Sequence, residues 1–90
     1  MQDPLQALIG EIVVLDTQTP IVYIGTLQAL TEYGLVLENV DMHDCRDGHA
    51  NKEAYLADVH DNGIAVNRRS IVVMRHVVIS ISKLVDVVND

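Results

Sequence analysis

The 90-residue chain has no tryptophan and no phenylalanine, and it has only one cysteine, Cys45. One cysteine excludes an intrachain disulfide, and the spacings CxxC, CxxH and HExxH that bind structural or catalytic zinc are missing as well. A chain of this length buries only about 60 to 65% of its unfolded surface, so one core gives marginal stability. We therefore expect further burial to come from association between chains.

Basic residues are also few. Six Lys and Arg stand against thirteen Asp and Glu, which gives a net charge of −7 at pH 7. This charge repels phosphate at long range. Any binding of nucleic acid must therefore come from a local cluster of residues, and we expect it to be weak at physiological salt.

Long apolar runs and a recognisable leader are missing too. The first four residues contain neither the basic nor the apolar region of a signal peptide, and the longest apolar run is far shorter than the roughly 20 residues of a membrane span. The sequence therefore predicts a cytoplasmic protein without a membrane partner.

What the chain does have is an aliphatic, β-rich composition. Hydrophobic residues make up 49% of the sequence, mostly Val, Ile, Leu and Ala. With no internal repeat and no low-complexity tract, we expect a single domain over residues 1–90. Alternation and turn signals predict strands at residues 11–16, 21–30, 35–41, 64–66, 70–75 and 77–85.

Gly25 interrupts the second predicted strand. An isolated glycine in a strand marks a sharp bend or a close backbone approach, as the corners of a barrel require. In the last third of the chain, residues 71–74 and 77–79 are apolar on both faces. We expect this segment to be buried on both sides or to pair with another chain, because a free edge of this kind promotes aggregation.

A short α-helix is predicted near the N-terminus. Asp3 is a good N-cap, Pro4 fits the first helical position, and Gly10 can end the helix in a left-handed conformation. The apolar stripe of this helix consists of Leu5, Leu8 and Ile9. So short a helix is not stable alone and must lie on an apolar surface.

The pattern between residues 42 and 63 is weaker. Residues 42–49 are predicted to form a polar loop, and residues 51–60 a helix capped by Asn51. The alternation of Tyr55, Ala57 and Val59 fits a strand nearly as well, but the number of good helix formers favours the helix. At the other end, residues 86–90 are predicted to be a frayed or lightly docked tail.

Several of these segments together resemble the motifs of Sm-like (LSm) proteins. The run GEIVVL at residues 10–15, GTL at 25–27 and YGLVLENV at 33–40 resemble the first Sm motif. The second motif, an I-R-G core followed by an alternating strand, is resembled by MRH at 74–76 and by residues 77–83. The motifs would then span about residues 10–41 and 70–85, with residues 42–63 as an insertion that decorates one face of the assembly.

The resemblance implies an all-β fold: a small, strongly bent, five-stranded antiparallel barrel of SH3 type with a short N-terminal α-helix. It also implies a homo-oligomeric ring, a hexamer or heptamer in preference to a pentamer. In such a ring the strand ending near Arg75 pairs with the last long strand of the next subunit. The residues implied at this interface are Val73, Val77, Ile79 and Ile81.

By the same resemblance, an RNA-binding pocket would contain Thr31, Tyr33, Gly34, Arg75 and His76. The family's uridine-binding turn carries Asp, an aromatic residue or His, and Asn. Here the Asp is Thr31, the Asn is absent, and the Gly after Arg75 is His76. A pocket without that amide loses its main means of reading uracil, so we expect stacking on Tyr33 and the cation of Arg75 to support weak, sequence-tolerant binding.

Two functions follow from the resemblance. The first is an RNA-binding ring with weakened uridine specificity, acting as an RNA chaperone or as a ribonucleoprotein component of RNA metabolism. The alternative is a structural or protein-interaction ring that has lost the nucleotide pocket. If these two residues do not bind RNA, we expect Tyr33 to pack on its own barrel and Arg75 to pair with a carboxylate of a neighbouring subunit.

The remaining polar residues suggest no other chemistry. No nucleophile motif, phosphate-binding glycine loop or pair of catalytic carboxylates is present, so we expect no enzyme activity and no cofactor. His60 is predicted to lie at a surface or interface. The doublet Arg68-Arg69 is predicted to be a solvated turn, or else to contact an RNA phosphate or another subunit. One loop contains metal-ligand types without a known metal-site spacing, and we predict that no metal binds there: Asp41, His43, Asp44, Cys45, Asp47 and His49.

Overall fold

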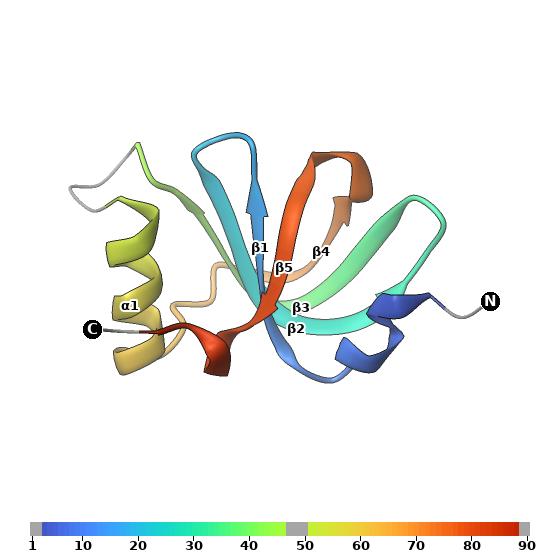
Figure 1. Cartoon of the computed structure of the whole chain (residues 1–90), viewed down its shortest axis with the longest axis horizontal. Coiled ribbons are helices and arrows are strands. Elements are labelled where there is room, and N and C mark those ends of the chain that lie inside the picture. The colour runs from blue at the N-terminus through green and yellow to red at the C-terminus, as the bar shows by residue number, and fades with distance from the viewer. Residues whose placement is uncertain (1–2, 47–50, 89–90) are drawn as a thin grey trace.

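A computed structural model describes residues 3–46 and 51–88. Its strands form one antiparallel sheet of five strands in the order β4-β3-β2-β1-β5, which confirms the predicted all-β fold class. Figure 1 shows this sheet wrapped around itself, with the one α-helix of the described residues at the far end from the N-terminus. The elements are η1 (Pro4–Leu8), β1 (Ile12–Thr17), β2 (Ile21–Leu30), β3 (Gly34–Asp44), α1 (Lys52–Asn62), β4 (Arg68–Met74), η2 (Arg75–Val77), β5 (Val78–Lys83) and η3 (Leu84–Asp86), where η marks a 3-10 helix.

The bend of the sheet is centred on Gly25 of β2. The register between β2 and β3 shifts between Ile24 and Thr26, so that two residues of β3, Asn39 and Val40, face Gly25. Asn39 adopts a left-handed conformation with φ 53°, which asparagine tolerates better than most residues. A Cβ atom on Gly25 would lie 3.1 Å from both a β3 carbonyl oxygen and the Val40 side chain. The predicted bend at Gly25 is confirmed.

The bent sheet buries side chains on both of its faces. Val13 and Leu15 of β1 belong to a core inside the barrel, whereas Val14 between them belongs to a second core on the opposite face. The barrel core contains Val13, Leu15, Leu27, Leu35, Leu37, Val40 and Val73. The second core contains Val14, Val22, Ile24, Tyr55, Val59 and Leu84. This division explains why β1 is apolar at consecutive positions.

Helix α1 covers the second core. Tyr55 and Val59 are buried beneath it, at the i and i+4 positions of one helical face. The Asn51 side chain accepts a hydrogen bond from the Ala54 N–H at 2.8 Å and caps the helix, and Gly63 with φ 93° ends it. The predicted helix is confirmed, and the strand alternative for this segment is wrong.

A polar contact fastens α1 to the end of β3. The Tyr55 hydroxyl donates to the carboxylate of Asp41, which is only 4% exposed and also accepts from Asn67 Nδ2 at 3.3 Å. The His43 ring stacks on the Tyr55 ring, with centroids 3.9 Å apart and planes 6° from parallel. Burial, together with the hydrogen bond to Asp41, raises the pKa of Tyr55, so the phenol stays neutral and remains a donor.

The N-terminal helix differs from the prediction in type. It is a single five-residue 3-10 helix rather than an α-helix, although Asp3 caps it as expected, by accepting from the Leu5 N–H at 3.0 Å. Ile9 already has an extended backbone, and the Gly10 N–H donates to the Leu27 carbonyl at 2.8 Å. This bond ties the chain to β2 directly after the helix ends.

Further boundaries also differ from the prediction. Residues 64–66 form no strand, because regular pairing with β3 begins only at Arg68. The polar loop starts later than residue 42, since β3 continues to Asp44 and pairs with the start of β2. The last two predicted strands are separated by η2, so β4 ends at Met74 and β5 begins at Val78. Residues 47–50 of the predicted loop lie outside the described residues.

The C-terminal tail is docked as far as it is described. Leu84 in η3 is 9% exposed and belongs to the second core, and Val87 packs against the same core. Of the predicted tail, residues 89–90 lie outside the described residues. None of the helices described has the length and apolar character that crossing a membrane requires.

The contact between Tyr55 and Asp41 predicts a measurable loss of stability. Tyr55→Phe keeps the ring and removes the donor, which leaves a buried carboxylate oxygen without its partner. We expect a decrease of about 1 to 3 kcal/mol in the free energy of unfolding, measured by urea denaturation. Tyr33→Phe is the matched control, because Tyr33 is 68% exposed and should change stability little. Equal stabilities of the two variants would contradict the role given to Asp41.

Candidate functional site

The β2–β3 turn and η2 meet at one end of the barrel. Thr31, Tyr33 and Gly34 belong to the turn and the start of β3, while Arg75 and His76 belong to η2. The Arg75 N–H donates to the Tyr33 carbonyl at 2.9 Å, which joins the two segments directly. The structure thus brings together all five residues implied for an RNA-binding pocket, from two regions more than 40 positions apart in the sequence.

Thr31 and Gly34 close the turn. The Thr31 N–H donates to the Gly34 carbonyl at 2.9 Å, and the Gly34 N–H donates to the Thr31 hydroxyl at 2.9 Å. A Cβ atom at Gly34 would lie 2.6 Å from Val72 Cγ1 and 3.0 Å from the Val73 carbonyl oxygen, so only glycine fits there. The Thr31 hydroxyl is therefore used inside the turn, where it holds the backbone in shape.

Tyr33 presents the only aromatic side chain among the large exposed apolar residues of the described chain. Its side chain is 68% exposed at the tip of the turn, and His76 next to Arg75 is exposed as well. An exposed ring on a rigid turn can stack on a flat ligand without first leaving a core. Tyr33 does not pack on its own barrel as the alternative prediction supposed.

The Arg75 guanidinium is already engaged within its own chain. Its Nε donates to the Thr31 carbonyl at 3.0 Å, and its Nη2 lies 2.7 Å from Asp3 Oδ2. Both partners of this ion pair are partly buried, with 33% of the Arg75 side chain and 29% of the Asp3 side chain exposed. The pKa of the Asp3 carboxyl is lowered, first by the Leu5 N–H that it accepts and then by Arg75.

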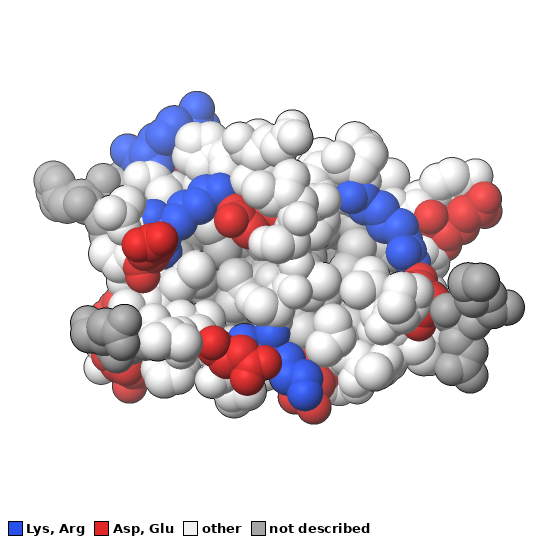
Figure 2. Space-filling model, viewed as in Figure 1, with Lys and Arg blue, Asp and Glu red and all other residues white. Residues whose placement is uncertain are grey.

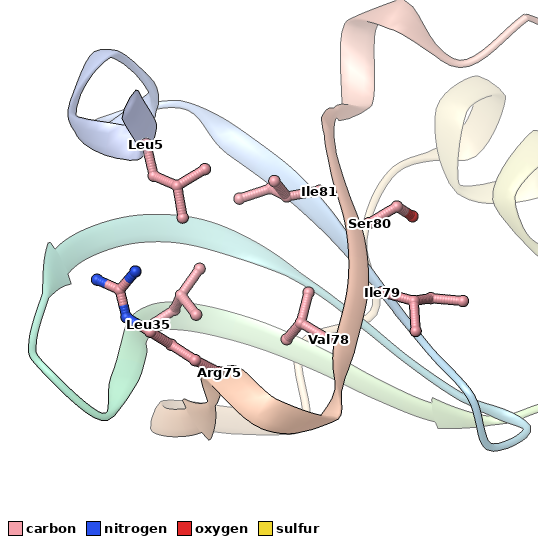
Figure 3. Close-up of a pocket in the computed structure, with 7 residues that line it drawn as sticks. All are labelled: Leu5, Leu35, Arg75, Val78, Ile79, Ser80 and Ile81. Carbon is pink, nitrogen blue, oxygen red and sulfur yellow. The ribbon is translucent and has the colours of Figure 1, made fainter. Parts of the chain in front are cut away.

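A cavity of about 260 Å³ opens beside this ion pair, between η1 and β5. Figure 3 shows Leu5, Leu35, Val78 and Ile81 pointing into it, with the Arg75 guanidinium at one side. Ile79 points away from the cavity toward solvent. The cavity is thus an apolar hollow with a cation at its mouth, next to one edge of the sheet.

The chain matches no known family model and no curated protein. Among solved structures it is similar to an Sm protein of Pyrococcus abyssii that was solved in complex with a uridine heptamer. The two structures align with a TM-score of 0.59 and 16% sequence identity, over 91% of this chain and 99% of the other. The chain has the Sm-like fold. At this identity the likeness is one of fold, and the residues of the site must be judged on their own contacts.

In this Sm-like fold the cations are spread out, and half of them form ion pairs within the described residues. Three of the six Lys and Arg residues form ion pairs with carboxylates: Lys52 with Asp16, Arg46 with Asp44, and Arg75 with Asp3. On the face shown in Figure 2, the basic side chains lie apart from one another, and most of them lie next to acidic ones. The site therefore gains little long-range attraction for phosphate, and contact at short range must supply any binding.

Arg68 and Arg69 do not form a turn before the strand. They are the first two residues of β4, both exposed, and the Arg68 guanidinium donates to the Asn67 carbonyl at 2.9 Å. Their place at the opposite end of β4 from Arg75 separates them from the site.

At the end of β3, the described residues of metal-ligand type make contacts within the fold. Asp41 and His43 contact Tyr55, and Asp44 pairs with Arg46 at 2.6 Å. The described residues contain no group of three or more His, Cys, Asp or Glu side chains able to hold a metal ion. Asp47 and His49 lie outside the described residues.

The four implied interface residues lie on or beside the two edge strands, in different environments. Val73 is 3% exposed and belongs to the barrel core, so only its backbone is available at the β4 edge. Val77 and Ile81 are half-buried against the same core, whereas Ile79 is 57% exposed. Two exposed residues of β4 were not among the predicted interface residues: Val72, which is 52% exposed, and Met74, which is 43% exposed. Because side chains alternate between the two faces of a strand, the buried Val73 is the sequence signal that could have identified its exposed neighbours.

The Asp3–Arg75 ion pair predicts a linked change in titration. Because the folded pKa of Asp3 is lowered, the contact stabilises the fold above the ordinary carboxyl pKa of 3.8, and that stabilisation is lost as the pH falls through the lowered value. Arg75→Gln should therefore raise the Asp3 pKa toward 3.8, as measured by NMR titration of the carboxyl carbon.

Arg46→Gln is the control for that measurement. Arg46 holds the pKa of Asp44 at about 2, and its loss should raise that pKa while leaving Asp3 unchanged. An Asp3 pKa that does not respond to Arg75→Gln would contradict the ion pair.

Proposed function

We propose that the chain forms a closed homo-oligomeric ring that binds single-stranded RNA where the β2–β3 turn meets η2. The observation that carries the proposal is the exposed Tyr33 ring, held directly beside Arg75 and His76 by a 2.9 Å backbone hydrogen bond. The proposal includes no catalytic step, metal or cofactor.

The sheet edges support the ring. β4 pairs only with β3, and β5 pairs only with β1, so each has one backbone edge without a partner in the sheet. Both strands carry exposed apolar side chains, among them Val72 and Met74 on β4 and Ile79 on β5. Pairing β4 of one subunit with β5 of the next would cover both edges, and a head-to-tail contact of this kind closes into a ring when the rotation permits.

The exposed aromatic residue supports RNA as the ligand. In a ring, one Tyr33 per subunit would offer successive stacking surfaces to successive bases, and stacking accepts every base. Several modest sites on one strand of RNA act together, so a weak site per subunit gives useful overall affinity. The Pyrococcus Sm protein bound to a uridine heptamer indicates the class of ligand to test first.

Specificity for uridine should be weak. The Thr31 hydroxyl is bonded to Gly34, and no asparagine follows Tyr33 in the turn. Without a side-chain amide directed at the base, hydrogen bonds that distinguish uracil are missing. Such a ring suits the sequence-tolerant binding of an RNA chaperone or of a general component of RNA metabolism.

A protein-interaction ring without a nucleotide pocket is the second candidate. The net charge of −7 and the neutralisation of Arg75 by Asp3 favour it, because both reduce attraction for phosphate. The two candidates share the same ring and differ only in whether the Tyr33 end of the barrel binds RNA.

Light scattering tests the ring. We expect a mass six or seven times the 10.0 kDa of one chain, with five copies as the smaller alternative. Ile79→Asp should dissociate the ring, since burying an unpaired charge at each interface costs several kcal/mol. Val85→Asp is the control, because Val85 is 74% exposed in η3, outside both edge strands. A mass of one chain for the unaltered protein at micromolar concentration would refute the ring.

Fluorescence anisotropy with oligo-U and oligo-A, at two salt concentrations, tests RNA binding. Tyr33→Ala should weaken both ligands alike, by about 1 to 3 kcal/mol per stacked base, and Tyr33→Phe should retain binding. If neither oligonucleotide binds better than micromolar at low salt, the protein-interaction ring replaces the RNA proposal. A preference for oligo-U that survives Tyr33→Ala would assign base reading to another residue, such as Asn39 or His76.

A further inference from the structure

Asp3 pairs with Arg75, the arginine that the described residues place in the candidate site. We infer that Asp3 competes with RNA phosphates for Arg75, so that the N-terminal 3-10 helix sets the affinity of the site. The inference rests on the proposed RNA-binding function and extends it by naming an acidic residue outside the expected pocket that restrains binding.

The Arg75 guanidinium is held between the turn and Asp3. Arg75 Nε is held by the Thr31 carbonyl at 3.0 Å, which fixes the guanidinium against the turn that carries Tyr33. The Nη2 group faces Asp3 Oδ2 at 2.7 Å. A phosphate that takes the Asp3 position on Nη2 displaces the carboxylate, and one that binds Nη1 lies close to the Asp3 charge and is repelled by it.

Asp3 can release Arg75 without unfolding its own helix. Its two carboxylate oxygens have separate partners, because Oδ1 caps η1 through the Leu5 N–H at 3.0 Å while Oδ2 binds Arg75. Leu5 and Leu8 pack against the barrel core, and the Gly10 N–H donates to the Leu27 carbonyl at 2.8 Å. These contacts hold η1 in place, so the exchange of one anion for another is local.

The ion pair between Asp3 and Arg75 is also weak enough for an RNA phosphate to compete with the carboxylate. Both side chains keep about a third of their surface in solvent, with 33% and 29% exposed, and ion pairs of this kind are weak. A phosphate can replace the carboxylate at moderate cost, and a ring repeats that cost at every subunit that contacts RNA. Asp3 would thus keep the ring from holding RNA tightly while leaving the stacking surface of Tyr33 open.

Asp3→Asn isolates the competition from the helix cap. Asparagine is as good an N-cap as aspartate, so the bond to the Leu5 N–H is retained while the negative charge is removed. Glu53→Gln is the matched control, because it removes the same charge from the exposed first turn of α1, on the other side of the molecule from η1 (Figure 1).

The experiment measures anisotropy of a fluorescent oligo-A at several salt concentrations. We expect Asp3→Asn to bind about two- to fivefold more tightly per site than the unaltered protein. The slope of log K against log salt should steepen by about 0.7 for each arginine released to a phosphate. Glu53→Gln should match the unaltered protein in slope. If the Asp3→Asn variant binds the oligonucleotide and the unaltered protein does not, the inference is also supported, because the ion pair of Asp3 with Arg75 would then prevent binding.

Three results would overturn the inference, and they differ in what they imply for RNA binding itself. If Asp3→Asn and the unaltered protein bind with the same affinity and slope while Tyr33→Ala weakens binding, RNA binding stands and the competition is refuted. If even Asp3→Asn binds no oligonucleotide at low salt, RNA binding itself is refuted and the inference falls with it. Equal tightening by Glu53→Gln would show a general effect of net charge, and would refute a specific role for Asp3.

Discussion

The sharp bend of β2 and β3 is the constraint on which the rest of the structure depends. At this point two residues of β3 face the single residue Gly25, and Asn39 takes a left-handed conformation to make this possible. The bend turns a five-stranded sheet into a barrel in which β4 and β5 are the edge strands. Each of these strands has one backbone edge that is not paired in the sheet. It also carries the far end of the β2–β3 hairpin to η2, where the candidate site forms.

Because of the same bend, the apolar side chains of the sheet are buried in two separate cores. The barrel core lies inside the curve, and the second core lies on the outer face, where α1 and η3 cover it. The insertion between β3 and β4 therefore extends the hydrophobic interior of a small chain, and it is fastened there by the buried contact of Tyr55 with Asp41. Helix α1 thus belongs to the stability of the fold, while the candidate site lies at the other end of the hairpin.

Local sequence patterns predicted the elements of the fold well where a residue, in its context, has a single structural role. Gly25 in an apolar strand meant a bend, Asn51 before a run of helix formers meant a helix cap, and both are found in the structure. The strand expected at residues 64–66 failed because apolar alternation cannot show whether a partner strand is within reach. The helix expected after Asp3 is present as a 3-10 helix rather than an α-helix, and the bond from Gly10 to Leu27 that fixes the chain after it joins distant residues, so no local pattern could show it.

The candidate site was predictable in membership but not in chemistry. Motif resemblance named the residues of the turn and of η2, and the fold brings them together. It could not show that the Thr31 hydroxyl closes its own turn, or that Arg75 binds Asp3, a residue 72 positions away. These contacts depend on three-dimensional packing, and they decide which groups can bind a ligand. Those groups are the ring of Tyr33, the exposed His76 and, where a phosphate replaces Asp3, the Arg75 guanidinium.

The central claim is that RNA binds at the end of the barrel where Tyr33 and His76 are exposed. Ultraviolet cross-linking of a bound oligonucleotide, followed by peptide mass spectrometry, tests that claim most directly because it locates the contact. We expect cross-links in the peptides that contain Tyr33 and His76. Cross-links confined to α1, or to Arg68 and Arg69 at the other end of β4, would contradict it.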